Sequence, residues 1–221
     1  MEEVVKIISI ANVTHNVKAF RLTKPAGYSF EPGQATEVSI NKGKWKEEKR
    51  PFTFTSLNEW PYLEFTIKIY NDHDGVTNQL GKLKEGDELI LRDVWGAISY
   101  KGPGYFIAGG AGITPFIAIL RQLYKDKRVS DNQLYFSNKT SSDIILHQEL
   151  DMILGNKAHY VLTQQQTGEY MNGYIDKKFL SKNINDFSKP FYICGPDKMV
   201  SDLNEVLIES GANPEAVVFE K

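Results

Sequence analysis

The chain has 221 residues, enough for one large domain or two small ones, each with a buried core. Lysine and arginine number 26 against 28 aspartates and glutamates, so the formal charge of −2 gives no global attraction to nucleic acid or anionic lipid. The single cysteine, Cys194, excludes disulfide frameworks, four-cysteine zinc sites and cysteine-held iron–sulfur clusters. These counts predict a globular protein of a reducing compartment that does not bind nucleic acid.

The stretch from Gly102 to Leu120 carries no charge and is almost long enough to span a bilayer. Glycines and prolines interrupt it, which indicates a buried strand, a phosphate-type loop and the start of a helix instead. The first residues, Met1-Glu2-Glu3, are acidic where a secretory signal is basic. We therefore expect a cytoplasmic protein with no membrane span.

The first hundred residues have the pattern of short strands separated by turns, which is typical of a closed or nearly closed antiparallel β-barrel. In Leu63 to Ile69 apolar and polar residues alternate, so one face is expected to pack inward and the other to meet solvent. One helix is predicted from about Val76 to Leu83. The predicted strands are Val4 to Ile10, His15 to Leu22, Gln34 to Ile40, Pro51 to Thr55, Tyr62 to Tyr70 and Asp87 to Arg92.

After residue 101 short apolar runs alternate with longer amphipathic ones, and this βαβ rhythm predicts a doubly wound α/β domain with a parallel sheet. The sequence thus predicts two domains, residues 1–101 and 102–221. The predicted strands are Tyr105 to Ala108, Gln133 to Phe136, His159 to Leu162 and Phe191 to Cys194, and the helices lie near Ile113 to Tyr124, Ser142 to Leu154 and Asp197 to Ser210.

A glycine-rich loop, Gly109 to Pro115, lies directly between a predicted strand and a predicted helix. Glycine lets the backbone approach a diphosphate, and the free N–H groups at a helix start attract its charge. A tight strand-to-helix turn is the alternative, since the full dinucleotide fingerprint is not present. The placement between strand and helix favours nucleotide binding.

Three further clusters have both a structural and a functional interpretation. Arg50 to Ser56 is either an ordinary strand or a site where an arginine grips a phosphate and Phe52 and Thr53 meet a flat ring. Asp72 to Leu80 is either a capped helix or an anion site at a helix start. Tyr192 to Met199 passes from the carboxyl end of a strand into a helix, where ligands bind in open α/β sheets.

Together these motifs carry a resemblance to the ferredoxin-NADP reductase superfamily, in order and spacing and over nearly the whole chain. The resemblance implies a barrel that binds FAD and an α/β domain that binds NADH or NADPH. The flavin residues it implies are Arg50, Pro51, Phe52, Thr53, Gly75, Val76 and Thr77, with Thr53 near flavin N5. The nucleotide residues it implies are Gly110, Ala111, Gly112, Ile113 and Thr114, with Cys194, Gly195 and Pro196 beside the nicotinamide.

The resemblance also implies a terminal aromatic, Phe219, followed by Glu220, on the exposed face of the flavin; a strand at the sheet edge is the alternative. Phe52 stands where relatives usually have tyrosine. Thr163-Gln164-Gln165 stands where NADP-specific relatives place an arginine, which favours NADH, although Lys139 could supply a charge.

The implied activity is hydride transfer from NADH or NADPH to bound FAD, and then electron transfer to flavodoxin, ferredoxin or an oxygenase component. The expected catalytic residues are Thr53, Cys194, Phe219 and Glu220, and no metal is expected. The loop from Lys42 to Lys49 is either a solvated hairpin or a docking edge for an acidic acceptor. A flavin reductase with loosely held flavin and a binding module without turnover remain alternatives.

Overall fold

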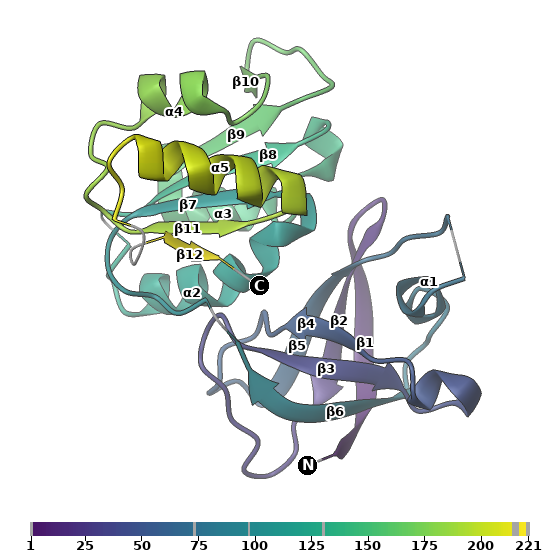
Figure 1. The fold of residues 1–221 in the computed structure, drawn as a ribbon. Helices are drawn as coiled ribbons and strands as arrows, with labels where there is room; N and C mark the ends of the chain where they lie inside the picture. Colours follow the sequence, from purple (N-terminus) through teal and green to yellow (C-terminus); the bar gives the residue numbers. More distant parts are fainter. Residues whose placement is uncertain (1, 73, 97, 130, 214–216, 220–221) are drawn as a thin grey trace.

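The structure is a computed structural model that describes residues 2–72, 74–96, 98–129, 131–213 and, for the backbone alone, 217–219. The chain forms a β-barrel followed by an α/β domain, and the two lie side by side (Figure 1). This arrangement confirms the predicted fold class. No helix within the described residues is both long and apolar enough to cross a bilayer.

The barrel is built from six antiparallel strands in the order β4-β3-β6-β1-β2-β5. A bridge between Phe54 and Phe65 joins the two ends of this sheet and closes it. The six predicted strands are all present, with boundaries that differ by a few residues. The strands are β1 (Glu3–Thr14), β2 (Val17–Thr23), β3 (Ala35–Ile40), β4 (Arg50–Thr53), β5 (Tyr62–Lys68) and β6 (Glu88–Trp95).

Strand β5 departs from the expected exposure pattern. Leu63, Phe65 and Ile67 fill the barrel core as predicted, but Glu64 and Thr66 on the opposite face are only 3% and 5% exposed. The expectation that this face meets solvent was wrong, because the α/β domain supplies an arginine that contacts Glu64. The short helix α1 (Val76–Leu80) ends at Leu80, three residues earlier than predicted.

The second sheet has the order β10-β9-β8-β7-β11-β12, and every pairing in it is parallel. Helices α2 and α3 cover one face and α4 and α5 the other, as a doubly wound sheet requires (Figure 1). The strands are β7 (Tyr105–Gly109), β8 (Gln133–Asn138), β9 (Ala158–Leu162), β10 (Met171–Asn172), β11 (Phe191–Cys194) and β12 (Val217–Phe219). The helices are α2 (Thr114–Lys125), α3 (His147–Leu154), α4 (Lys177–Asn183) and α5 (Asp197–Glu209).

Two details differ from the sequence prediction. The helix expected from Ser142 begins only at His147, because Thr140 and Asp143 close a separate 3₁₀ turn and Leu146 adopts a left-handed conformation at φ +54°. Strand β10 and helix α4 were not predicted, since neither is longer than seven residues.

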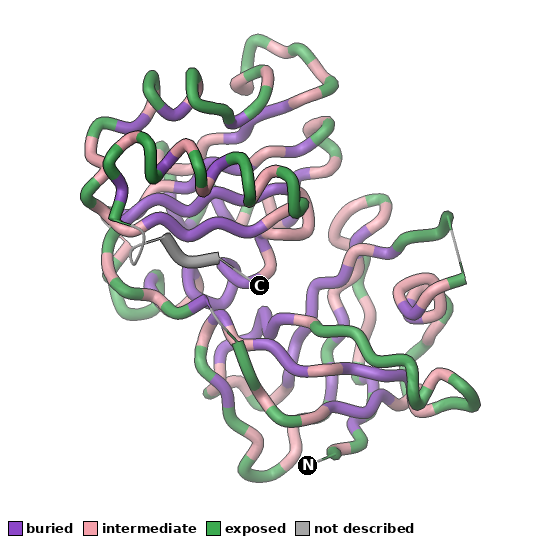
Figure 2. The backbone as a smooth tube through the Cα atoms, viewed as in Figure 1, coloured by how far each residue is buried: buried purple, intermediate pink, exposed green. Residues whose placement is uncertain are grey.

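The boundary between the barrel and the α/β domain is packed rather than open. Val17, from the barrel hairpin, and Ile98, from the connecting segment, belong to the same apolar cluster as helix α2. Figure 2 shows buried backbone running through both sheets and into α2. The position of α2 relative to the barrel is therefore set by side-chain contacts as well as by the chain connection.

Candidate functional site

A cavity of about 880 Å³ lies at the carboxyl ends of β7, β8, β9 and β11. The barrel closes one side of it with Asn16, Val17, Lys68 and Tyr70. Ligands of open α/β sheets bind at this edge of the sheet, so the cavity lies where the topology predicts a nucleotide.

The glycine-rich loop forms one wall of the cavity. Between β7 and α2 it makes a 3₁₀ turn, Gly110–Ile113, and the Thr114 hydroxyl donates to the Ala111 carbonyl at 3.0 Å. A Cβ on Gly112 would lie 2.3 Å from the Cys194 carbonyl oxygen, whereas one on Gly110, at φ +53°, would meet nothing within 4 Å. Gly112 therefore permits a close backbone contact, and Gly110 leaves open space beside the loop.

The loop after β11 forms the adjoining wall. Cys194 pairs with Ala108 in the sheet, is 8% exposed and lines the cavity together with Gly195 and Pro196. Helix α5 begins immediately afterwards at Asp197. The structure thus brings the predicted residues of the two nucleotide motifs to one cavity, with the exception of buried Ile113, which is not among its lining residues.

Asn138 is a cavity residue that sequence reasoning missed. It ends β8, is 5% exposed, and neither polar atom of its side chain finds a hydrogen-bond partner among the described residues. Buried amides without partners are rare because losing water costs about 1–3 kcal/mol. A polar residue at the carboxyl end of a parallel strand is the sequence signal that identifies it.

The charged side chains around the cavity are mixed and fit a dinucleotide. Lysines and aspartates both line the cavity, and the lysines are cations that can bind a diphosphate. No arginine is among the described lining residues. A bound nucleotide would hydrogen-bond the unpartnered Asn138 amide and fill the open space beside Gly110. The charged lining residues are Lys68, Lys139, Lys177, Lys198, Asp143, Asp176 and Asp202.

The predicted flavin residues on β4 lie outside this cavity. Arg50 has a side chain that is 51% exposed, with Nη1 donating to the Lys49 carbonyl at 2.6 Å. Phe52 is half-buried, 6.5 Å from the Phe65 ring, and Thr53 is 7% exposed. An exposed guanidinium beside an aromatic ring and a hydroxyl is a donor set that fits a flavin nucleotide.

The predicted phosphate turn of the barrel is the start of α1. Gly75 precedes the helix in an extended conformation and, as a glycine, supplies no side-chain cap. The first N–H groups of a helix lack intrahelical partners, so Gly75, Val76 and Thr77 fit the predicted contact with phosphate. One residue further along, the Asn78 side-chain oxygen is buried without a partner in the part of the chain described.

The residues predicted to cover the flavin lie at the chain terminus. The backbone of Phe219 pairs with Ile193 at the edge of the sheet, while its side chain and Glu220 lie outside the described residues. Within the described ranges, no group of three or more histidine, cysteine, aspartate or glutamate side chains is placed to hold a metal ion.

Comparison with known proteins assigns each domain. Residues 4–100 match the oxidoreductase FAD-binding domain family, and residues 106–205 match the oxidoreductase NAD-binding domain family. The predicted cofactors, FAD and NADH or NADPH, are confirmed at the level of these families.

Relatives and solved structures match across almost the whole chain. NADH-cytochrome b5 reductase 1 of Pyricularia oryzae is 29% identical over 87% of this chain and 69% of its own. The reductase component of propane 2-monooxygenase of Rhodococcus jostii is 26% identical over 98% of this chain and 62% of its own. A ferredoxin NADP+ reductase from Neisseria gonorrhoeae, solved with bound FAD and NADP, superposes with a TM-score of 0.86 at 21% identity, covering 99% of this chain and 98% of its own.

Both domain families are oxidoreductase modules that occur here in the same order as the two folded units. The chain belongs to the ferredoxin-NADP reductase superfamily.

Proposed function

We propose that this protein is an NADH-dependent flavoprotein reductase that delivers electrons to a separate protein acceptor. The observation that carries the proposal is the cavity between the glycine-rich loop, the loop after β11 and the barrel wall. FAD, when bound, accepts a hydride from the nicotinamide and passes electrons on singly. The protein's own contribution is to bind and orient, so no general acid or base is required.

The barrel residues are proposed to hold the flavin. Arg50 and the N–H groups of Gly75, Val76 and Thr77 would bind its phosphates. Pro51 would complete the strand of the motif, Phe52 would contact the ring system, and Thr53 would donate to a ring nitrogen. Support comes from the exposed Arg50 guanidinium and the extended Gly75 at the start of α1.

The α/β domain is proposed to hold the nicotinamide nucleotide. The loop from Gly110 to Thr114 would bind the diphosphate, and Cys194, Gly195 and Pro196 would lie beside the nicotinamide. Phe219 and Glu220 are proposed to cover the flavin ring. The division at residues 101 and 102 is likewise our proposal, supported by the two separate sheets.

NADH is the proposed reductant. The 2′-phosphate of NADPH is usually recognised by arginine, and the described cavity lining contains none. The Gln165 side-chain oxygen, after β9, accepts a hydrogen bond from the Ser141 N–H at 2.7 Å, and a neutral amide cannot neutralise a 2′-phosphate. Lys139 and Lys177 line the cavity and are cations that a 2′-phosphate of NADPH would require.

The acceptor is proposed to be an acidic redox protein, such as a flavodoxin, a ferredoxin, a cytochrome or an oxygenase component. The named relatives include reductases of cytochrome b5 and of a monooxygenase. The loop from Lys42 to Lys49 is exposed except for Trp45, which packs partly against the barrel core and over which Lys44 lies at 4.7 Å. This anchoring favours a docking edge over a loose hairpin. A cytoplasmic location stays a prediction from sequence.

An anaerobic visible spectrum recorded during titration with NADH, and then with NADPH, tests the proposal. A yellow protein that retains flavin through gel filtration and bleaches with NADH at lower concentration than with NADPH supports it. Flavin lost on gel filtration supports a flavin reductase instead. A protein that takes up no added FAD contradicts both and favours a binding module.

A further inference from the structure

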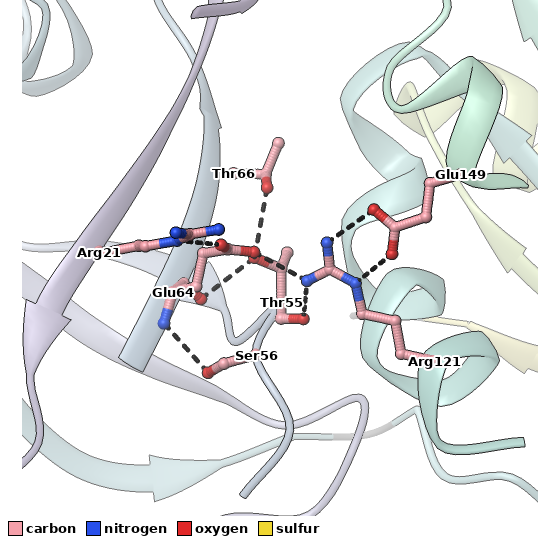
Figure 3. A network of polar contacts seen from close by, with 7 residues as sticks. All are labelled: Arg21, Thr55, Ser56, Glu64, Thr66, Arg121 and Glu149. Carbon is pink, nitrogen blue, oxygen red and sulfur yellow. Dashed lines mark hydrogen bonds and ion pairs between the residues drawn. The ribbon is translucent and has the colours of Figure 1, made fainter. Parts of the chain in front are cut away.

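Arg121, in the second half of helix α2, joins the two domains through a buried network of ion pairs. Its Nη1 donates to Glu64 Oε1 of strand β5 at 2.7 Å and to the Thr55 carbonyl at 2.6 Å. Its Nε and Nη2 donate to the two carboxylate oxygens of Glu149, on helix α3, at 2.5 and 2.9 Å. Figure 3 shows this guanidinium between the barrel and the α/β domain.

On the barrel side, both oxygens of the Glu64 carboxylate have hydrogen-bond partners. Glu64 has a side chain only 4% exposed, and its second oxygen accepts from Arg21 Nε at 3.1 Å. The Thr55 hydroxyl donates to Glu64, and the Glu64 N–H donates to the Ser56 hydroxyl at 3.0 Å (Figure 3). Each polar group around Arg121 therefore has a fixed direction as well as a partner.

Arg121 stays protonated although it is buried. Burial lowers the pKa of a guanidinium, but hydrogen bonds and charges from Glu149 and Glu64 outweigh it and raise the pKa of Arg121 above its usual value. The guanidinium also lies over the Trp60 ring at 5.1 Å. A planar fork that binds two carboxylates and a carbonyl fixes orientation in a way that a lysine cannot.

The network joins the two segments that carry the proposed cofactor sites. Thr114, at the start of α2, closes the glycine-rich loop, and Arg121 follows it by about two helical turns on the same rigid helix. On the barrel side, Thr55 follows Thr53 of the flavin strand by two residues. A displacement at Arg121 is therefore transmitted to both sites.

We propose that Arg121 is a positioning residue that sets the separation between the nicotinamide held by the α/β domain and the flavin held by the barrel. The inference rests on the proposed function, since it concerns hydride transfer between those two sites. Because a misplacement of about 1 Å can cost about 100-fold in rate, small movements of α2 against β5 matter. Stability alone does not explain the network, because buried ion pairs are often replaceable by apolar side chains without loss.

Anaerobic stopped-flow reduction by NADH tests the proposal, with four variants compared to wild type. Arg121→Met is expected to lower the limiting rate of flavin reduction about 100-fold, while FAD content and the NADH dissociation constant stay within about twofold. Arg121→Lys keeps the charge but not the fork and should recover part of the rate. Lys125→Met, one turn along α2 and in an exposed pair with Glu59, is the matched control and should leave the rate within about twofold.

The double variant Arg121→Met with Glu64→Leu separates positioning from stability. It removes both buried charges, so its urea midpoint is expected to stay close to wild type while its reduction rate stays low. This variant and Arg121→Lys carry the test if Arg121→Met does not fold. Calorimetry of the same purified proteins gives a readout without turnover: the two domains should melt together in wild type and over a broader temperature range in the double variant, with the mean melting temperature close to wild type.

The outcomes distinguish this inference from the proposed function. Wild type that NADH does not bleach would overturn the proposed function. If NADH bleaches wild type but the flavin of the Arg121 variants is reduced at the same limiting rate, the role of Arg121 alone is overturned. The same holds if flavin reduction in Lys125→Met is as slow as in the Arg121 variants. A rate loss in the double variant that simply follows a loss of stability would also overturn it.

Discussion

Replacing Gly112 with alanine tests how closely the two cavity loops pack. A Cβ there would lie 2.3 Å from the Cys194 carbonyl oxygen, 2.4 Å from its carbon and 2.6 Å from the Gly195 nitrogen, against an ordinary contact of 3.4 Å or more. All three atoms are backbone, so no side-chain rotation relieves the contact. The loops must separate by about 1 Å, and overpacking of this kind costs about 1–3 kcal/mol.

The expected functional effect follows from the same displacement. Because Gly112 and Cys194 line adjoining walls of the proposed nucleotide cavity, a shift of about 1 Å should lower kcat/KM for NADH about 100-fold, or about 2.7 kcal/mol. Strand β4 is untouched, so flavin content should not change. The assay is flavin reduction by NADH under anaerobic conditions, with flavin content measured on the same sample.

Gly168→Ala is the matched control for this substitution. A Cβ on Gly168 would meet nothing within 4 Å, and the residue does not line the cavity. It should behave as wild type in both measurements. If Gly112→Ala also reduces its flavin with wild-type kinetics, the two loops do not position the nucleotide and the reasoning is refuted.

Three further outcomes are expected. Asn138→Leu should raise the melting temperature of the nucleotide-free protein or leave it unchanged, because the buried Asn138 amide has no partner in the described residues, and it should raise KM for NADH. A lower melting temperature with an unchanged KM would contradict this expectation. Lys46→Glu should slow electron transfer to a flavodoxin and flatten its salt dependence, with reduction by NADH unchanged. Burial lowers the pKa of His159 below its usual 6.5, so the unfolded chain binds the proton first as pH falls through about 6.5, and the free energy of unfolding decreases. His159→Gln should make this decrease smaller, which urea titrations at pH 7.5 and 5.5 would measure.

Local patterns predicted the fold because each strand and motif is specified by neighbouring residues. Residues 109–115 combine glycines, a threonine and a proline directly after an apolar strand, and the structure places that run at the start of α2. The strand with alternating residues around Phe65 was predicted correctly, but the burial of its polar face was not. Alternation identifies which residues share a face, and only the tertiary structure determines what covers that face.

The contacts between domains could not be predicted in this way. Arg121 meets a carboxylate 57 residues earlier and another 28 residues later in the chain. Each of these residues, taken alone, has the sequence context of an ordinary exposed charge on an amphipathic element. Asn138 is different, because its place after an apolar strand already marked the ligand edge of a parallel sheet.

The chain connection and helix α2 together determine how far the two domains can move. The connection is held at one end, where the Tyr192 hydroxyl accepts from the Lys101 and Gly102 N–H groups at 2.9 and 3.0 Å. A single attachment of this kind still permits rotation about it. The contact of His15 with Asp143 spans 3.7 Å with an exposed imidazole, so it adds little resistance. Rotation is opposed by the apolar contacts of Val17 and Ile98 with the α2 cluster and by the hydrogen bonds of Arg121, so the separation of the two proposed cofactor sites depends in part on a side chain that contacts neither.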